Sequence, residues 1–485
     1  MTITIVGLGP GSVDDLSLKA WRTLENAEKV YLRTERHPCV PQLPQNTTYK
    51  SFDALYESIE AFEDVYAKIT ETLLKAAKSG AVVYAVPGDP LVGESTTTRI
   101  LAAAKIENIT VNIINGISFI EPMLAHLGID ALNGLQILDG LDIAAMHHPP
   151  INPEYPTLIA QVYSRTVASD IKLTLMNQYP DDFEVTLIHG AGTEGQIVET
   201  IPLYEIDRSE QINHLTSLYL PAAGEYTSFE SFQEVIAHLR APEGCPWDRK
   251  QTHNSLRPYL IEEAYEVLEA IDNGDWEALV GELGDLLLQI VLHTQIATEY
   301  DEFHMKDVLE YVNRKMIRRH PHVWGTADVN GNPDTVVANW EEIKQREKSD
   351  NGEKTESLLD GIPKGTPSLM VALKYQAKAA TVGFDWSDVS GVEDKVREEL
   401  AEIFAETDSH LKAREITDLM FVLVNWLRWL GIDDPESLMR EQNAKFYRRF
   451  HYIESQATNP LTEMSLDEME ALWLEAKKLE SKRSD

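Results

Sequence analysis

The chain has 485 residues, and its 79 acidic against 43 basic side chains give a formal charge of −36 at neutral pH. This length exceeds one ordinary hydrophobic core and predicts two or three domains. The negative charge would repel a phosphate backbone and argues against extended nucleic acid as a partner. Small phosphorylated ligands remain open if a divalent cation and a few local bases offset the charge.

The amino-terminal segment and the cysteines indicate a cytoplasmic protein. The opening stretch MTITIVGLGPGS lacks a basic region before its apolar run and soon reaches turn residues. No apolar run approaches the ~20 residues that a bilayer span needs, so no membrane association is expected. Cys39 and Cys245 lie far apart in the sequence, which argues against a disulfide framework and fits a reducing compartment.

Residues 1–220 alternate short β-rich runs with helical stretches, which is the pattern of an α/β domain. The runs are TITIVGLG, KVYLR, AVVYAVPG, TVNIING, LQILDG, LTLMNQY and EVTLIHG. The first run ends in a glycine turn, whose backbone N–H groups a ligand can approach closely. Gly7 and Gly9 fit the start of a dinucleotide fingerprint, but Ser12 replaces its last glycine and no acid ends the next strand. We therefore disfavour NAD binding, and the sequence also lacks a P-loop motif.

The order of GLGPG, PGDP and NGIS resembles the tetrapyrrole (corrin/porphyrin) methylase family over residues 1–220. The resemblance implies a two-lobed α/β fold that binds S-adenosylmethionine between its lobes. It places cofactor contacts at Pro10, Gly88, Asp89, Ser95, Thr96, Thr97, Ile117, Ser118 and Phe119. Members of that family methylate tetrapyrroles, a modified histidine precursor or ribosomal RNA, so the methyl acceptor stays open. A retained fold without activity is the alternative.

After residue 220 the apolar residues recur with a helical period. We predict a linker at 221–228, a first helical repeat at 229–350, a connecting segment at 351–368 and a second repeat at 369–485. Each repeat carries an acid pair (IEEAYEVLEA, REELAEIFAE), an acid cluster (VGELGDLLLQIV, AREITDLMFVLV), a basic segment (VNRKMIRRH, QNAKFYRRF) and a Trp (VVANWEEIK, MEALWLEAK). These features in one order indicate an internal duplication. The plainer alternative is two helical stretches of similar composition.

Acids stand three and four residues apart among the apolar positions of both repeats. This spacing puts Glu262 or Glu263 over Glu266, and Glu282 over Asp285, on one helix face. Like charges so placed repel by about a few tenths of a kcal/mol at a wet surface, and by more near a core. Antiparallel helices would bring both pairs together, where Mg²⁺ would remove the repulsion; the alternative is a solvated acidic face. The pattern recurs at Glu398, Glu399, Glu402, Glu415 and Asp418.

The duplicated E-E-x-x-E and E-x-x-D pattern, with EGCPWDRKQTH before the first copy and AKFYRRF closing the second, resembles MazG nucleotide pyrophosphohydrolases over residues 229–485. The resemblance implies an all-α, Mg²⁺-dependent and commonly dimeric enzyme that splits nucleoside triphosphates into monophosphate and pyrophosphate. It places metal ligands at Glu263, Glu266, Glu282 and Asp285 in the first repeat and at Glu399, Glu402, Glu415 and Asp418 in the second. It places substrate contacts at Lys395, Lys445, Arg448, Arg449 and Trp473. Trp473 could equally be a residue of the hydrophobic core.

The leading acids of the two pairs, Glu262 and Glu398, are candidates to hold the water that attacks the α-phosphorus. The second repeat has Lys395 where the first has Tyr259, which favours the second repeat as the working site. We therefore expect a cytoplasmic homodimer whose main activity is nucleoside triphosphate hydrolysis, fused to a methyltransferase-like domain with an unknown acceptor. Two other interpretations stay open: methyl transfer is primary and the helical part regulates it, or the acidic helices serve only dimerisation.

Overall fold

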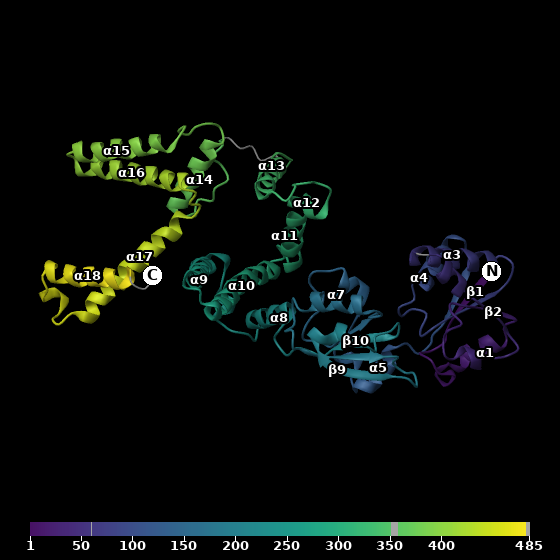
Figure 1. Ribbon diagram of the computed structural model, residues 1–485. Helices are drawn as coiled ribbons and strands as arrows, with labels where there is room; N and C mark the ends of the chain where they lie inside the picture. Colours follow the sequence, from purple (N-terminus) through teal and green to yellow (C-terminus); the bar gives the residue numbers. More distant parts are fainter. Residues whose placement is uncertain (60, 351–356, 482–485) are drawn as a thin grey trace. The chain divides into compact units, whose positions relative to one another are not determined.

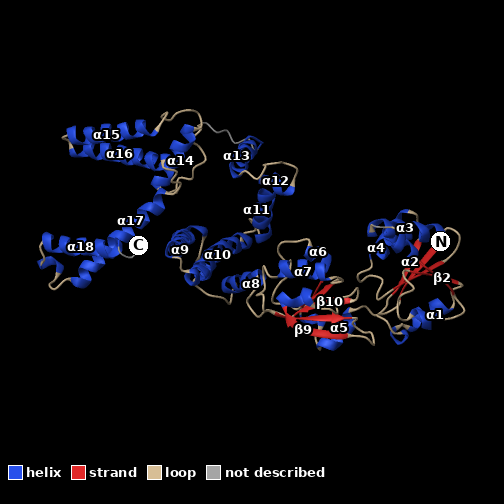
Figure 2. Cartoon of the chain, in the orientation of Figure 1, coloured by secondary structure: helices blue, strands red, loops and turns tan. Residues whose placement is uncertain are grey.

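The computed structural model describes residues 1–59, 61–350 and 357–481. The chain forms two compact units, Met1–Val308 and Leu309–Asp485 (Figure 1). Figure 2 shows the strands confined to the amino-terminal part of the chain, with helices after them. The predicted connecting segment and second repeat include residues 351–356 and 482–485, which lie outside the described residues.

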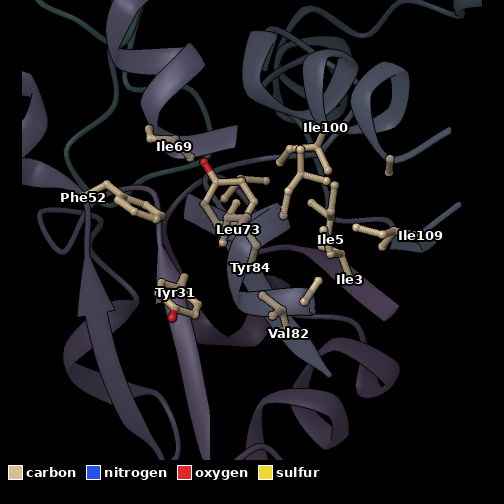
Figure 3. Packing of buried hydrophobic residues seen from close by; sticks show 14 of the residues in the cluster. Ile3, Ile5, Tyr31, Phe52, Ile69, Leu73, Val82, Tyr84, Ile100 and Ile109 are labelled. Atoms are coloured by element: carbon tan, nitrogen blue, oxygen red, sulfur yellow. The ribbon is translucent and has the colours of Figure 1, made fainter. Parts of the chain in front are cut away.

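The first sheet is parallel, with the strand order β3-β2-β4-β1-β5. Its strands are β1 (Thr2–Gly7), β2 (Lys29–Leu32), β3 (Thr48–Ser51), β4 (Val82–Val86) and β5 (Thr110–Ile114). The helices in this lobe are α1 (Leu18–Glu25), α2 (Asp53–Ser58), α3 (Phe62–Ala77) and α4 (Ser95–Ile106). Figure 3 shows Ile3, Ile5 and Tyr84 of the sheet against Leu73 of α3 and Ile100 of α4.

The opposite face of the first sheet is also covered. Val6 of β1 and Leu32 of β2 belong to a separate buried cluster with Ala20 and Leu24 of α1. A parallel sheet buried on both faces needs apolar residues at successive positions of its central strands. This requirement explains why these strands stand out in the sequence as nearly continuous apolar runs.

The second sheet is mixed, with the strand order β6-β7-β10-β8-β9. Its strands are β6 (Gln136–Asp139), β7 (Thr157–Ala160), β8 (Glu184–His189), β9 (Ile197–Pro202) and β10 (Thr216–Leu220), and its helices are α5 (Ile120–Leu127), α6 (Gly140–Ala144) and α7 (Arg165–Leu175). β6 and β7 pair in parallel, whereas the other neighbours pair antiparallel. The predicted two-lobed α/β architecture is thereby confirmed.

One predicted strand is wrong. LTLMNQY, residues 173–179, forms the end of α7 and the turn that follows it. Val167, Ile171 and Leu175 are buried at helical spacing against the second sheet, so the helical period of α7 outweighs the strand-like Leu-Thr-Leu alternation at residues 173–175. Strands β3, β7, β9 and β10 lie outside the predicted runs.

Beyond β10 the first unit is helical. Its helices are α8 (Phe229–Arg240), α9 (His253–Asn273), α10 (Trp276–Glu299) and the start of α11 (Met305–Arg319). α9 and α10 pack on each other, joined by Gly274 at a φ of +65°, a left-handed position that glycine adopts readily. Asp275 then caps α10 by accepting a hydrogen bond from the N–H of Ala278. The compact units divide after Val308, so these helices group with the sheets, and the domain limits given above remain a prediction.

The described residues of the second unit form helices and loops. The helices after α11 are α12 (Pro321–Trp324), α13 (Pro333–Asp350), α14 (Ser368–Ala380), α15 (Val389–Ala405), α16 (Ser409–Trp429), α17 (Pro435–Gln456) and α18 (Leu466–Ser481). α15 packs on α16, α14 on α16 and α17, and α17 on α18. The predicted all-α second half is confirmed. Across the described ranges, no helix has the length and apolarity that crossing a bilayer requires.

Candidate functional site

The α9–α10 pair brings the first group of predicted metal ligands together. Glu263 and Glu266 on α9 and Glu282 on α10 each offer a carboxylate oxygen, and these oxygens lie within 4.8 Å of one another. Burial, and then the charges of Asp285 and Glu266, raise the pKa of Glu263. Burial, Glu266 and Asp285 likewise raise the pKa of Glu282. The fourth predicted ligand, Asp285, is thus close enough to act on both, and Glu262 is exposed beside them on α9.

The α15–α16 pair repeats this arrangement. Oxygens of Glu399, Glu402 and Glu415 lie within 4.8 Å of one another. Burial, then Glu402 and Asp418, raise the pKa of Glu415. Glu399 is only 4% exposed, and its Oε2 has no hydrogen-bond partner among the described residues.

These two clusters suit a hard divalent cation. All their ligand atoms are carboxylate oxygens, which Mg²⁺ prefers over the nitrogen and sulfur ligands of softer metals. The raised pKa values of Glu263, Glu282 and Glu415 indicate that ionising all the acids together is unfavourable without a counter-charge. In the second cluster the buried, unpartnered Oε2 of Glu399 is an additional acceptor for such a cation.

Lys395 distinguishes the second cluster from the first. Its Nζ lies 2.9 Å from Glu398 Oε1 and 2.9 Å from Glu399 Oε1. Hydrogen bonds to Glu399 and Glu398 raise the pKa of Lys395, so the ammonium is firmly charged. Tyr259 occupies the corresponding position of α9, where its ring packs edge-on against Trp247. The positively charged side chain of Lys395 therefore lies beside the acids of the second repeat.

The remaining predicted substrate residues lie on α17 and α18. Arg448 and Arg449 both pair with Glu480, at 3.6 Å and 2.8 Å respectively. The guanidinium of Arg449 stands 5.4 Å over the ring of Trp473, whose other neighbour is Phe446 at 5.3 Å. Within the described residues, no hydrogen bond or ion pair links Lys445, Arg448, Arg449 or Trp473 to the second acidic cluster.

The first repeat contains the same arrangement of two arginines, which is missing from the substrate contacts predicted from the sequence. Arg318 and Arg319 on α11 pair with Glu347 on α13, at 2.7 Å and 2.6 Å. The guanidinium of Arg319 stands 5.5 Å over the ring of Trp340. The aligned basic segments and Trp motifs were the signal for these residues. Each repeat therefore consists of an acidic helix pair followed by a second pair tied by two arginines, a Trp and a Glu.

A cavity of about 480 Å³ lies between the two lobes of the α/β part. Of the residues predicted to contact the cofactor, Pro10, Gly88, Asp89, Ser118 and Phe119 line it. Ser95, Thr96, Thr97 and Ile117 are not among its lining residues. Thr96 and Thr97 are buried at the start of α4, where the Thr96 hydroxyl bonds Tyr84 Oη at 3.1 Å.

The cavity is shaped by glycines and carries polar groups that sequence reasoning missed. A Cβ at Gly7 would lie 2.6 Å from Gly88 O, so the two turns meet in a way that only glycine allows. Asp89 holds the adjoining loop by accepting bonds from the N–H groups of Gly116 and Leu91. His37 also lines the cavity; burial lowers its pKa, and its Nε2 has no partner in the described part of the chain. Such a cavity fits a cofactor of the size and polarity of S-adenosylmethionine.

The fold and the sites define a class of protein: a two-lobed methylase-type domain joined to duplicated helices that carry carboxylate clusters. A sequence model of tetrapyrrole (corrin/porphyrin) methylases matches residues 2–207, and one of the MazG nucleotide pyrophosphohydrolase domain matches residues 251–324.

Curated relatives extend these matches along the whole chain. The uncharacterized protein YabN of Bacillus subtilis (strain 168) is 43% identical, over 99% of each chain. The nucleoside triphosphate pyrophosphohydrolase/pyrophosphatase MazG of Thermotoga maritima is 43% identical over 51% of this chain and 95% of that protein. The nucleoside triphosphate pyrophosphohydrolase of Escherichia coli (strain K12) is 40% identical over 51% and 95%. The chain belongs to the YabN-type family, in which a tetrapyrrole methylase domain is fused to a MazG nucleotide pyrophosphohydrolase domain.

Proposed function

We propose that the helical part hydrolyses nucleoside triphosphates to the monophosphate and diphosphate with Mg²⁺, and that the second repeat is the working site. The observation that carries this proposal is the buried, unpartnered oxygen of Glu399 within a carboxylate cluster next to Lys395. The names of the Thermotoga and Escherichia relatives support the reaction class.

Glu399, Glu402, Glu415 and Asp418 would hold the cation, which supplies charge neutralisation on the phosphoryl oxygens when bound. Glu398 is the base: it is exposed at the edge of the cluster, and Lys395 holds its carboxylate in place at 2.9 Å. Water loses a proton to Glu398 as its oxygen attacks the α-phosphorus. The bond from that phosphorus to the bridging oxygen breaks, and the β- and γ-phosphates leave as diphosphate.

The test compares Glu399→Gln with Glu263→Gln, the matched change in the first repeat. With the full chain, Mg²⁺ and a mixture of nucleoside triphosphates, Glu399→Gln should reduce diphosphate release by about 100-fold or more, the order expected for losing a group that acts in the transition state. Glu263→Gln should retain activity. Loss of activity in Glu263→Gln with an active Glu399→Gln would reject the second repeat as the working site, and an inactive wild-type protein would reject the hydrolase.

We also propose that the protein is a homodimer that buries matching apolar rows of the two repeats. Leu283, Leu287 and Ile290 on α10 share one helix face and are 50%, 37% and 42% exposed. Ile416, Met420 and Leu423 occupy the corresponding positions of α16 and are 44%, 45% and 41% exposed. Exposed apolar rows of this kind are typical of protein interfaces. Sedimentation equilibrium should give twice the chain mass; a monomer at micromolar concentration would contradict the proposal.

For the α/β part we propose binding of S-adenosylmethionine in the cavity lined by Gly88, Asp89 and Phe119, with an acceptor that stays unnamed. The supporting observations are the glycine-shaped wall and the unpartnered Nε2 of His37. Isothermal titration of the full chain with S-adenosylmethionine should give one site per chain, and Phe119→Ala should weaken binding by about tenfold because apolar contact is lost. No heat at high ligand concentration would reject a cofactor role for the cavity.

A further inference from the structure

His37 is a buried histidine in the wall of the cavity between the two α/β lobes. It belongs to the loop that follows β2, at the carboxyl ends of the parallel strands of the first sheet. Gly9 and Asp89, which follow β1 and β4, line the same cavity. Ligands of open α/β sheets bind outside the carboxyl ends of the strands, so His37 lies on the ligand side of its sheet.

Contacts at both ends hold the loop of His37 in place. Arg33, the first residue after β2, pairs with the buried carboxylate of Glu94, and its Nη1 lies 2.8 Å from Glu94 Oε2. The carbonyl oxygen of His37 accepts a hydrogen bond from the N–H of Val40 at 3.0 Å. The imidazole is thus positioned by the fold before a ligand binds, as a reacting group must be.

The contacts of Cys39 set the tautomer of the His37 ring. The Sγ atom of Cys39 lies 3.1 Å from His37 Nδ1, and it donates its own hydrogen to the carbonyl oxygen of Leu8 at 3.8 Å. Burial raises the pKa of Cys39 to about 11, so the sulfur keeps this hydrogen and accepts the N–H of Nδ1. The Nε2 atom, which has no partner within the described ranges, therefore carries a lone pair.

The His37 ring is uncharged at neutral pH. Burial lowers the pKa of His37 below its ordinary value of 6.5, and a backbone hydrogen bond with Gly9 opposes this shift only in part. An uncharged imidazole can take up a proton, and histidine is the commonest general base of enzymes. A carboxylate or thiolate loses no proton when it is methylated, whereas an amine, amide or hydroxyl does. A neutral base in the cavity therefore indicates an acceptor of the second kind.

We propose that His37 Nε2 accepts the proton released in methyl transfer, and that the methyl acceptor is a nitrogen or oxygen atom carrying a hydrogen. The proposal rests on the cofactor binding proposed above, because S-adenosylmethionine supplies a methyl group on a positively charged sulfur. The lone pair of the acceptor atom forms the bond to the methyl carbon, while the bond from that carbon to sulfur breaks and sulfur keeps its electron pair. The proton of the acceptor atom passes to Nε2, so the positive charge ends on the imidazole.

The experiment compares two cofactor analogues by isothermal titration of the full chain. Sinefungin carries an amine on the carbon that replaces sulfur and its methyl group, whereas S-adenosylhomocysteine has nothing at the methyl position. The amine should donate to His37 Nε2, so sinefungin should bind the wild type about tenfold more tightly, the order expected for one hydrogen bond to a charged group. His37→Leu should abolish this preference. His37→Gln, whose amide oxygen can still accept, should keep part of it.

His214→Leu is the matched control, because His214 is a second histidine of the same cavity. This variant should keep the preference for sinefungin. In the wild type the preference should be present at neutral pH and be lost as the pH falls through the lowered pKa of His37, since a protonated ring has no lone pair to accept with. The other charged or titratable groups of the cavity are Arg33, Arg36, Asp89 and His214, and repeating the pH series in His214→Leu removes the second imidazole.

The outcomes separate the role of His37 from cofactor binding itself. A wild type that binds S-adenosylhomocysteine without preferring sinefungin, or a preference that His37→Leu leaves unchanged, overturns the proposal and leaves the cofactor site standing. A wild type that binds neither analogue rejects both. If His37→Leu does not fold, the wild-type pH series decides, and a preference that does not change with pH overturns the proposal.

Discussion

Lys395 and Glu399 stand one helical turn apart on α15, and their contact explains how an acid can be nearly buried among other acids. The ammonium supplies a charge-assisted hydrogen bond to Glu399 Oε1 at 2.9 Å, and a second to Glu398. Removing one partner of such a pair leaves the other charge without compensation. Lys395 therefore holds the carboxylates of Glu398 and Glu399 in place through these two contacts.

Replacing Lys395 with Met keeps the aliphatic stem and removes the charge. We expect the metal-free protein to lose about 1–3 kcal/mol of stability, because a buried carboxylate oxygen loses its donor. Calorimetric unfolding of the full chain at neutral pH measures this loss. Tyr259→Met, the same position in the first repeat, should change stability less. Equal effects of the two substitutions would show that the ion pair has no special role.

At the scale of elements, each acidic helix pair would gain stability from a bound cation. A carboxyl group whose pKa is raised by folding stabilises the fold only while it keeps its proton. For Glu263, Glu282 and Glu415 this contribution is present below the ordinary value of 4.5 and is lost as the pH rises through their raised values. A cation binds the ionised carboxylates, so the stability that it adds increases as the pH rises.

We therefore expect Mg²⁺ to raise the Tm of the chelator-treated protein more at a pH of about 8 than at about 5. Thermal unfolding with and without Mg²⁺ measures the difference, with sodium chloride at matched ionic strength as the control. Glu415→Gln should reduce the Mg²⁺ effect at the higher pH. A Tm shift of the same size at both values would count against the carboxylate clusters as the binding site.

The sequence was sufficient to predict features that depend on residues close together in the chain. Spacings of three and four residues place Glu399 over Glu402 and Glu415 over Asp418 on any helix, so the clusters followed once the helices were recognised. LTLMNQY failed because its first three residues, Leu-Thr-Leu, alternate like a strand, whereas its burial is set by the helical contacts of α7 with the second sheet. His37 could not be found, since its unpartnered Nε2 depends on long-range packing that no short motif encodes.

At the scale of the whole molecule, the joint between the α/β part and the helices is hydrogen bonded. Glu154 Oε1 in the second lobe accepts from Ser231 Oγ at 2.5 Å and from the N–H groups of Thr227 and Ser228 at 2.8 and 3.2 Å. Thr227 belongs to the loop just before α8, Ser228 is its N-cap residue, and Ser231 lies in its first turn. A residue of the second lobe thus satisfies donors at the start of α8.

Glu154→Ala should speed hydrogen exchange at the first turn of α8 without changing exchange in α9 or α10, because only the donors at the start of α8 lose their acceptor. These bonds, with that of Ser231 first, lower the pKa of Glu154, so their contribution is present above 4.5 and is lost as the pH falls through the lowered value. Asp182→Ala, an exposed acid of the same lobe, is the control. Unchanged exchange in Glu154→Ala would show that the joint is held by other contacts.

The Glu154 contact also bears on how freely the two halves of this fusion can be exchanged. A gene fusion begins with a covalent join that carries no specific bonds, and its halves can then be separated or recombined at that seam. Here Glu154 of the α/β part accepts hydrogen bonds from Thr227, Ser228 and Ser231 at the start of the helical part. A helical half moved to another carrier domain would need an acceptor at the same place, so this pairing restricts the partners that could replace the present one.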